Sequence, residues 1–265
     1  MKIALVDSGI GLLAAAAAVR RMRPDADLLL SADPDGMPWG PRTAADVARR
    51  AMECAVAAAE RQPDALIVAC NTASVHALPA LRAAFEPALP VVGTVPAIKP
   101  AAARGGSVAI WATPATTGSA YQRGLIAEFG NGAQVTGVPC PGLADAVQNA
   151  DSAAVAAAVA AAAARTPFDV HTVVLGCTHY ELVSDLIAAA LPGITLLGSA
   201  DAVAAQALRR IGAEPAAAPP GSRPGGLEVI LSGRPSPTLP PAALSYPEGA
   251  ALTAIPGHND AMARS

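Results

Sequence analysis

The chain has few aromatic residues and little charge. Aromatic side chains account for 3% of its 265 residues and charged side chains for 15%, whereas 52% are hydrophobic. Alanine, valine and leucine must therefore build the core, which is typical of helices packed on a buried parallel sheet. The net charge of −3 and the scattered arginines indicate neither a nucleic acid nor an acidic membrane surface as a partner.

The sequence also lacks a membrane-spanning run and a signal-peptide pattern. The Ala/Val-rich run at 153–164 is well short of the roughly 20 apolar residues that cross a bilayer. The N-terminal apolar segment ends at Asp7 and carries no cleavage pattern. We therefore expect a cytoplasmic protein. Its four cysteines are then free thiols rather than disulfides, namely Cys54, Cys70, Cys140 and Cys177.

Motifs for the common cofactors are missing. Lysine occurs only as Lys2 and Lys99, and neither lies where a pyridoxal-phosphate Schiff base would be expected. No GxxxxGK[ST] motif and no GxGxxG motif follows a strand, which argues against a nucleotide cofactor. Cys177 and His179 form a single pair rather than the cluster that a metal requires. We expect no cofactor and no metal.

Short apolar segments alternate with helical segments along most of the chain. Strands are predicted at 2–6, 27–30, 65–69 and 91–93, and again at 107–111, 135–138, 172–175 and 195–197. Helices are predicted up to about Met22, over 43–61 with Thr43 as N-cap, from 70 toward Phe85, from about 117 and over 152–165. This order predicts parallel sheets with helices on both faces.

The two halves of this pattern correspond to each other. Residues 3–7 align with 108–112, and Cys70 aligns with Cys177. In each half a cysteine follows a buried strand and precedes a helix. We interpret this as an internal duplication. It predicts two similar α/β domains related by a pseudo-two-fold axis, with the active site in the cleft between them.

Domain boundaries follow from the same pattern. Residues 1–97 form the first domain, and 207–234 return to it through a linker at 213–226 and a last strand at 227–231. Residues 98–206 form the second domain. From 235 to 265 the Pro-rich composition predicts a poorly ordered tail.

The predicted strand ends carry small polar or reactive side chains. They are Asp7-Ser8, Cys70-Asn71-Thr72, Thr113 with Thr116, and Cys177-Thr178-His179. Ligands of open α/β sheets bind at such ends. A helix N-terminus stabilises a thiolate and also binds a carboxylate. Two thiols on opposite walls would fit removal of a proton from one face of an α-carbon and delivery to the other.

Other candidates have simpler explanations. Cys54, within a helix, and Cys140, before a proline, are interpreted as packing residues. The histidines at 76, 171 and 258 are interpreted as structural or solvated. For Asp7, helix capping is the alternative to a role in the site.

Five segments, in order, resemble glutamate racemase. They are Asp7-Ser8-Gly9-Ile10-Gly11, Pro38-Trp39-Gly40, and residues 68–74, 112–116 and 175–180. The resemblance runs from about residue 2 to 212, with a weaker echo at 231–233. It implies cofactor-independent interconversion of L- and D-glutamate, which supplies D-glutamate for peptidoglycan. Glutamate is then the small-molecule partner, and a homodimer is one assembly open to the chain.

The resemblance also implies residue roles. Cys70 and Cys177 would be the acid/base thiols, each taking the α-proton of one enantiomer, with Asp7 and His179 as their respective supporting groups. The implied substrate-binding residues are Ser8, Pro38, Trp39, Gly40, Asn71, Thr72, Thr113, Thr116 and Thr178.

Three positions depart from the family pattern. Leu12 replaces a usual glycine, Trp39 a usual tyrosine, and Gln148 a glutamate thought to affect activity. Trp39 and Gln148 motivate one alternative, a racemase for aspartate or another amino acid. Leu12 and Gln148 motivate another, a catalytically weak ligand-binding or regulatory protein with the same cleft. Both cysteines and His179 favour an enzyme, because a binding protein gains nothing from opposed thiols.

Overall fold

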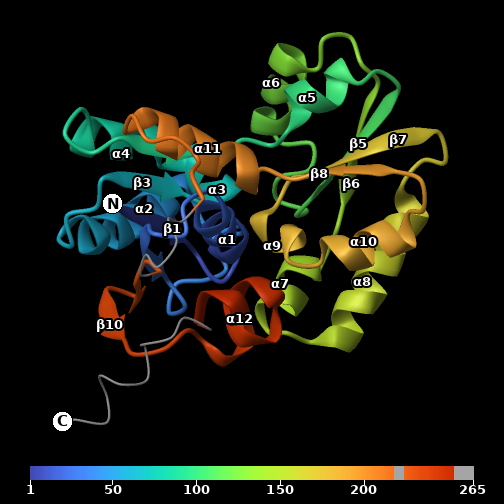
Figure 1. The fold of residues 1–265 in the computed structure, drawn as a ribbon. Helices are drawn as coiled ribbons and strands as arrows, with labels where there is room; N and C mark the ends of the chain where they lie inside the picture. Colours follow the sequence, from blue (N-terminus) through green and yellow to red (C-terminus); the bar gives the residue numbers. More distant parts are fainter. Residues whose placement is uncertain (218–223, 254–265) are drawn as a thin grey trace.

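Two sheets, one in each lobe of the molecule, carry the fold in the computed structural model, which describes residues 1–217 and 224–253 (Figure 1). The first sheet has the order β10-β9-β2-β1-β3-β4 and the second β6-β5-β7-β8. All neighbouring strands are parallel except β10, which pairs antiparallel with β9. The expected α/β fold with two parallel sheets is confirmed.

The strands follow the predicted order along the chain. The first sheet contains β1 (Lys2–Asp7), β2 (Asp27–Ala32), β3 (Ala65–Val68), β4 (Val91–Gly93), β9 (Leu227–Leu231) and β10 (Arg234–Ser236). The second contains β5 (Ser107–Ala112), β6 (Val135–Pro139), β7 (Val170–Leu175) and β8 (Thr195–Leu197). Strands β1, β3, β5 and β7 are buried apolar runs, as expected for a parallel sheet covered by helices.

The two sheets have equivalent topologies. The order β2-β1-β3-β4 in the first sheet corresponds to β6-β5-β7-β8 in the second. Cys70 follows β3, and Cys177 follows β7, the equivalent strand. Their backbone angles nearly coincide, with φ and ψ of −142° and 121° at Cys70 and −141° and 132° at Cys177. This correspondence supports the interpretation of an internal duplication.

Helices cover the sheets. They are α1 (Leu12–Met22), α2 (Ala44–Ala59), α3 (Asn71–His76), α4 (Leu78–Phe85), α5 (Ile98–Ala103), α6 (Ala120–Phe129), α7 (Leu143–Gln148), α8 (Ser152–Arg165), α9 (Thr178–Glu181), α10 (Ser184–Ala190), α11 (Ala200–Arg210) and α12 (Pro247–Thr253). Thr43 caps α2 as expected, since its side chain accepts a hydrogen bond from the Asp46 N–H. The single helix expected from Cys70 toward Phe85 is broken at Ala77, because Pro79 has no N–H to continue it.

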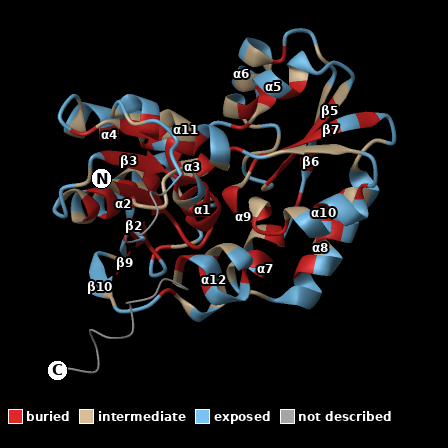
Figure 2. Cartoon of the chain, in the orientation of Figure 1, coloured by how far each residue is buried: buried red, intermediate tan, exposed pale blue. Residues whose placement is uncertain are grey.

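Helix α1 lies at the centre of the molecule and is buried from Leu12 to Val19 (Figure 2). It packs against β1, α9, α11 and α12. Its run of alanines allows neighbours on several sides to approach closely. One hydrophobic core includes Leu13 of this helix together with Val147 and Tyr180 of the second lobe. The two lobes are therefore joined through apolar contacts around α1.

The C-terminal segment is ordered as far as Thr253, so the expected poorly ordered tail is wrong for residues 235–253. This segment forms β10, a 3₁₀ helix (Pro241–Ser245) and α12. Leu239, Tyr246 and Leu252 are buried against the core that contains α1. The Pro-rich composition concealed these apolar residues, which are buried only because α1 and α7 lie beside them. Residues 254–265 lie outside the described part of the chain.

The chain returns to the first lobe before residue 207, the position expected from the sequence. Helix α11, which starts at Ala200, packs against α1, β3 and β4. The expected linker at 213–226 contains no helix or strand over 213–217 and 224–226, and 218–223 lie outside the described residues.

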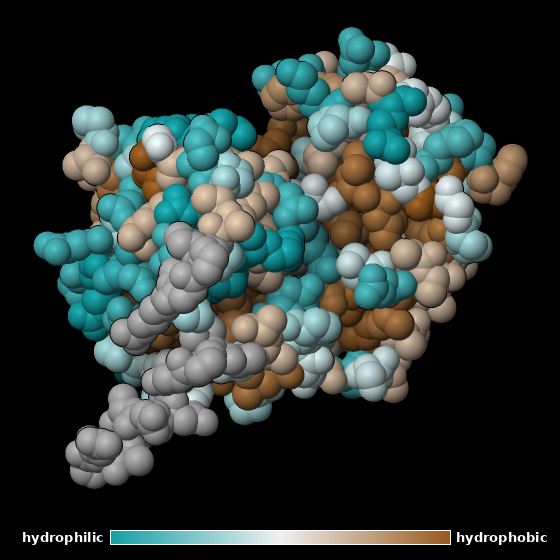
Figure 3. Space-filling model, viewed as in Figure 1, coloured by the Kyte–Doolittle hydropathy of each residue, from teal (hydrophilic) through white to brown (hydrophobic). Residues whose placement is uncertain are grey.

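The visible surface is mixed in polarity. Figure 3 shows apolar side chains gathered mainly on the second lobe, over β8 and beside α10. Within residues 1–217 and 224–253, no helix is both long and apolar enough to cross a membrane.

Candidate active site

A cavity of about 410 Å³ lies between the two lobes. Every residue proposed from the sequence lines it. They are Asp7, Ser8, Pro38, Trp39, Gly40, Cys70, Asn71, Thr72, Thr113, Thr116, Cys177, Thr178 and His179. The structure thus brings together residues that are up to 172 positions apart in the sequence.

The cavity lies where the carboxyl ends of equivalent strands meet. Asp7 ends β1, and Thr113 follows β5, its counterpart in the second sheet. Cys70 and Cys177 come two residues after β3 and β7. Each cysteine is the N-cap residue of a short helix, α3 or α9. Both sheets therefore present the edge at which α/β proteins bind ligands.

The first thiol, Cys70, lies beside a buried carboxyl group. Oδ1 of Asp7 accepts a hydrogen bond from the Ser8 N–H at 2.7 Å, whereas Oδ2 has no hydrogen-bond partner among the described residues. Burial raises the pKa of Asp7 to about 7, against the opposing effects of Cys70 and Ser8. Burial and the charge of Asp7 hold the pKa of Cys70 well above its ordinary value. Cys70 is thus a protonated thiol next to a carboxylate that can accept its proton.

The second thiol, Cys177, lies beside an imidazole. Its sulfur is 4.0 Å from Nδ1 of His179. Burial raises the pKa of Cys177 to about 12, although the N–H groups of His179 and Tyr180 act in the opposite direction. Burial also lowers the pKa of His179 to about 4. The helix N-termini were expected to stabilise the thiolates, but desolvation has the larger effect on the pKa of both cysteines.

Two glycines allow the lobes to approach each other. A Cβ atom on Gly11 would lie 2.6 Å from Oδ2 of Asp7 and 2.7 Å from Nδ1 of His179. A Cβ atom on Gly9 would overlap the side-chain amide of Gln148. The two glycines of the Asp-Ser-Gly-Ile-Gly segment are therefore required for steric reasons. Leu12, which follows it, lies in the core rather than in the cavity wall.

Among the described residues, the polar lining of the cavity includes hydroxyl and amide groups but no lysine or arginine. Its hydroxyls come from Ser8, Thr72, Thr113, Thr116 and Thr178. An anionic ligand would therefore be held by hydroxyl and backbone N–H groups.

Asn71 joins the two lobes at the cavity. Its Nδ2 donates to the Gly176 carbonyl at 2.6 Å, while Oδ1 is buried with no hydrogen-bond partner among the described residues. A buried acceptor left in this way suits a ligand that brings its own donor. Within residues 1–217 and 224–253, at the cavity or away from it, no three His, Cys, Asp or Glu side chains are grouped to hold a metal ion.

Comparison with known proteins agrees with this geometry. The pattern of the Asp/Glu/Hydantoin racemase family matches residues 11–207. The chain belongs to this family. It is thus an isomerase of the racemase type, and the resemblance inferred from the sequence is confirmed.

Relatives within the family include glutamate racemases. That of Pseudomonas putida F1 is 36% identical over 217 residues, which cover 80% of this chain and 82% of that protein. That of Roseiflexus sp. RS-1 is 40% identical over 211 residues, 76% of each chain. The solved Escherichia coli glutamate racemase, in complex with L-glutamate and the activator UDP-MurNAc-ala, is 30% identical. It has a TM-score of 0.76 and covers 92% of this chain and 91% of that one.

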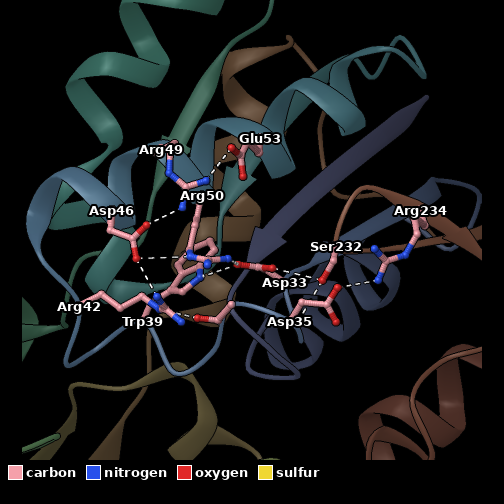
Figure 4. A network of polar contacts seen from close by, with 11 residues as sticks. Asp33, Asp35, Trp39, Arg42, Asp46, Arg49, Arg50, Glu53, Ser232 and Arg234 are labelled. Carbon is pink, nitrogen blue, oxygen red and sulfur yellow. Dashed lines mark hydrogen bonds and ion pairs between the residues drawn. The ribbon is translucent and has the colours of Figure 1, made fainter.

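Trp39, the departure from the usual family tyrosine, is fully accommodated. The side chain is buried, and its Nε1–H donates to Oδ2 of Asp33 at 3.0 Å. Asp33 also accepts from Arg50 at 3.1 Å, and its Oδ1 accepts from the Ser232 hydroxyl at 3.2 Å. Figure 4 shows Asp33 between Trp39 and Ser232. The loop at 33–41 is thereby fixed to α2 and to the turn after β9.

Sequence reasoning missed one wall of the cavity. The further lining residues are Met37, Pro41, Pro114, Ala115, Cys140, Pro141, Gly142, Ala144, Asp145 and Gly176. Part of this wall is α7, a helix that was not predicted. The only sequence signal is the apolar spacing of Leu143, Ala146 and Val147, which this helix buries, and it extends over six residues. Cys140, interpreted as a packing residue, is buried and also lines the cavity.

Proposed function

We propose that the chain interconverts L- and D-glutamate by a cofactor-independent two-thiol mechanism, supplying D-glutamate for peptidoglycan. The observation that carries this proposal is the placement of Cys70 and Cys177 at equivalent positions of the two sheets, on one cavity. The glutamate racemases among its relatives support the choice of substrate.

In the proposed reaction, the thiolate of one cysteine takes the α-proton, so the C–H bond breaks and its electron pair stays on the α-carbon. The other cysteine donates its thiol proton to the opposite face of that carbon, and a new C–H bond forms. The substrate leaves inverted, with the thiol and the thiolate exchanged. The same site therefore runs in both directions.

Each thiol needs a neighbouring proton acceptor in order to form its thiolate, because burial raises the pKa of both thiols. For Cys70 we assign this role to Asp7, whose pKa of about 7 places it between its two protonation states near neutral pH. For Cys177 we assign it to His179, which is neutral at pH 7 because burial lowers its pKa to about 4.

The cavity lining supports a dipolar substrate with two carboxylates. Oδ1 of Asn71, which has no hydrogen-bond partner in the described part of the chain, suits the ammonium group. The hydroxyls of Thr113 and Thr116, 3.2 Å apart, and those of Ser8, Thr72 and Thr178 suit the carboxylates. Pro38, Trp39 and Gly40 close the wall beside them.

We further infer a cytoplasmic location from the four free cysteines, Cys54, Cys70, Cys140 and Cys177. A small molecule is the expected partner, and a homodimer stays a prediction. Sedimentation of the purified chain at several concentrations would decide the assembly.

The experiment is α-proton exchange and optical inversion of L- and D-glutamate in D₂O, with no cofactor added. Wild type is compared with Cys70→Ser and Cys177→Ser. We expect inversion in both directions in wild type and loss in each variant. Inversion of aspartate or another amino acid, but not of glutamate, would overturn the substrate. Binding of glutamate without any exchange would overturn the enzyme and leave a ligand-binding protein.

A further inference from the structure

Gln148 is the last residue of α7 in the second lobe, and its side-chain amide contacts one residue of each lobe. Its Oε1 accepts a hydrogen bond from the Ile10 N–H at 2.9 Å, and Nε2 of His179 lies 2.9 Å from the same oxygen. The backbone N–H of Ile10 can only donate, so the oxygen of the amide must face it. The same oxygen can then only accept from His179.

This arrangement decides which nitrogen of the imidazole carries the proton. A neutral imidazole has one N–H donor and one acceptor nitrogen. Because Nε2 faces an acceptor, it carries the hydrogen, and Nδ1 keeps its lone pair. Nδ1 is the nitrogen that lies 4.0 Å from the sulfur of Cys177.

We propose that Gln148 is a positioning residue that holds His179 in its Nε2–H form, so that Nδ1 accepts the proton of Cys177. The kinetic consequence rests on the proposed function, whereas the state of the imidazole does not. Gln148 itself does not line the cavity. It acts through His179, which does.

The neutrality of Gln148 is part of this role. His179 is buried, and its pKa is lowered to about 4, so the resting imidazole is uncharged at pH 7. The ionisable groups that face it are Cys177, Asp7 on the far side of Gly11, and Asp145 in the adjacent cavity wall. A carboxylate in place of the amide would add a negative charge next to Nε2 and favour the imidazolium.

A purely structural role makes a different prediction. The bond to Ile10 joins the lobes, and the close approach of the amide requires Gly9 to lack a side chain. If Gln148 were only a link between the lobes, its removal would disturb both thiols equally. If it sets the form of His179, the effect must fall on the side of Cys177.

The first test is independent of activity. Nitrogen-15 NMR of the substrate-free chain reports which imidazole nitrogen is protonated, and loss of the signal in His179→Asn assigns it. We expect the Nε2–H form in wild type, a mixture of forms in Gln148→Met, and a raised pKa of His179 in Gln148→Glu. Gln134→Glu adds the same charge at an exposed position of the second lobe and should leave the signal unchanged. An Nδ1–H form in wild type, or a wild-type signal in Gln148→Met, would overturn the proposal.

The second test separates the two thiols. In a Cys70→Ser background only the enantiomer that faces Cys177 should exchange its α-proton, and in a Cys177→Ser background only the other. Adding Gln148→Met should slow the first exchange on the order of 100-fold, because proton-transfer assistance contributes about 10²–10⁴-fold. It should change the second by less than about twofold. An equal loss of exchange rate in both backgrounds would mean that Gln148 only links the two lobes and would overturn the proposal. Absence of exchange in wild type would instead reject the proposed function, while the NMR result would still decide the role of Gln148.

Discussion

The two lobes place equivalent thiols with nearly the same backbone geometry, yet they supply different proton acceptors. Cys70 and Cys177 follow equivalent strands and differ by less than about 15° in φ and ψ. Cys70 lies beside the carboxyl group of Asp7, whereas Cys177 lies beside the imidazole of His179. Burial raises the pKa of the first acceptor and lowers that of the second, because in each case it disfavours the charged form. The shared topology thus positions the sulfur atoms, and the local residues decide how each loses its proton.

The largest effect should come from removing either thiol. Cys70→Ser and Cys177→Ser should each lower racemisation by about 10³-fold or more, since a hydroxyl is a far weaker acid/base group here. Each variant should retain α-proton exchange for one enantiomer, opposite in the two variants. Proton NMR in D₂O measures this. If both variants exchanged the same enantiomer, the two thiols would not act from opposite sides.

The contact between the two halves can be disrupted at Gly11. Gly11→Ala would push a methyl group against Asp7 and His179, so we expect activity to fall about 100-fold and the free energy of unfolding to fall by about 1–3 kcal/mol. The matched control is Gly124→Ala in α6, where, apart from its own helix, no described residue lies within 4 Å of the added atom. That variant should keep full activity and gain up to about 1 kcal/mol. Racemisation rates and urea unfolding compare the pair, and equal behaviour would contradict the steric explanation.

The different acceptors should appear in the pH dependence of activity. The kcat/KM of wild type should rise with pH through about 7, as Asp7 loses its proton. Asp7→Asn should be much less active and lack this rise. His179→Asn should be less active but keep the rise. A rise that survives in Asp7→Asn would assign it to another group.

Asp7 should also affect stability, with a defined sign. Its pKa is raised from 3.8 to about 7 on folding, so between these values the folded chain holds a proton that the unfolded chain releases. The free energy of unfolding should therefore fall as the pH rises from about 4 to 7, by on the order of 4 kcal/mol. Asp7→Asn should remove this fall and be more stable than wild type at pH 8. Urea unfolding at pH 5 and pH 8 tests this, and an equal pH dependence in both proteins would contradict it.

The smallest effect concerns a link between the lobes. The hydroxyl of buried Tyr246 donates to the Val147 carbonyl of α7 at 2.6 Å. Tyr246→Phe should lower the free energy of unfolding by about 1 kcal/mol, with activity nearly unchanged. Tyr121→Phe, at a tyrosine of α6 whose pKa is affected only by burial, is the control and should have a smaller effect. Thermal unfolding measures the stability of both variants. An equal loss of stability in the two would show that the hydrogen bond from Tyr246 to Val147 does not stabilise the fold.

Much of the site could be predicted from the sequence, because strand ends are local features. Asp7 and Cys70 stop apolar runs that could only be buried strands, and Thr113 and Cys177 do the same in the second half. Since the carboxyl ends of parallel strands share one edge, these side chains had to meet once two sheets faced each other.

Other features were not accessible in this way. Helix α7 is only six residues long and follows a Cys-Pro-Gly turn, so its apolar pattern was too short to recognise. Residues 235–253 have a Pro-rich composition that suggested disorder, yet Tyr246 and Leu252 are buried against elements far away in the sequence. Composition reports the average of a segment, whereas burial depends on which neighbours it finds.

The sequence by itself determined the chemistry available to this protein, namely two cysteines in equivalent positions, an aspartate and a histidine near them, and hydroxyl side chains at the remaining strand ends. It also determined the order of strands and helices, because hydrophobic periodicity is local. Only the tertiary structure decided how these groups ionise and which of them act together. The pKa values of Asp7 and His179 follow from burial, and the link from Gln148 to Ile10 and His179 joins positions up to 169 residues apart. Both depend on the approach of the two lobes, which removes water from the site and which no single segment specifies.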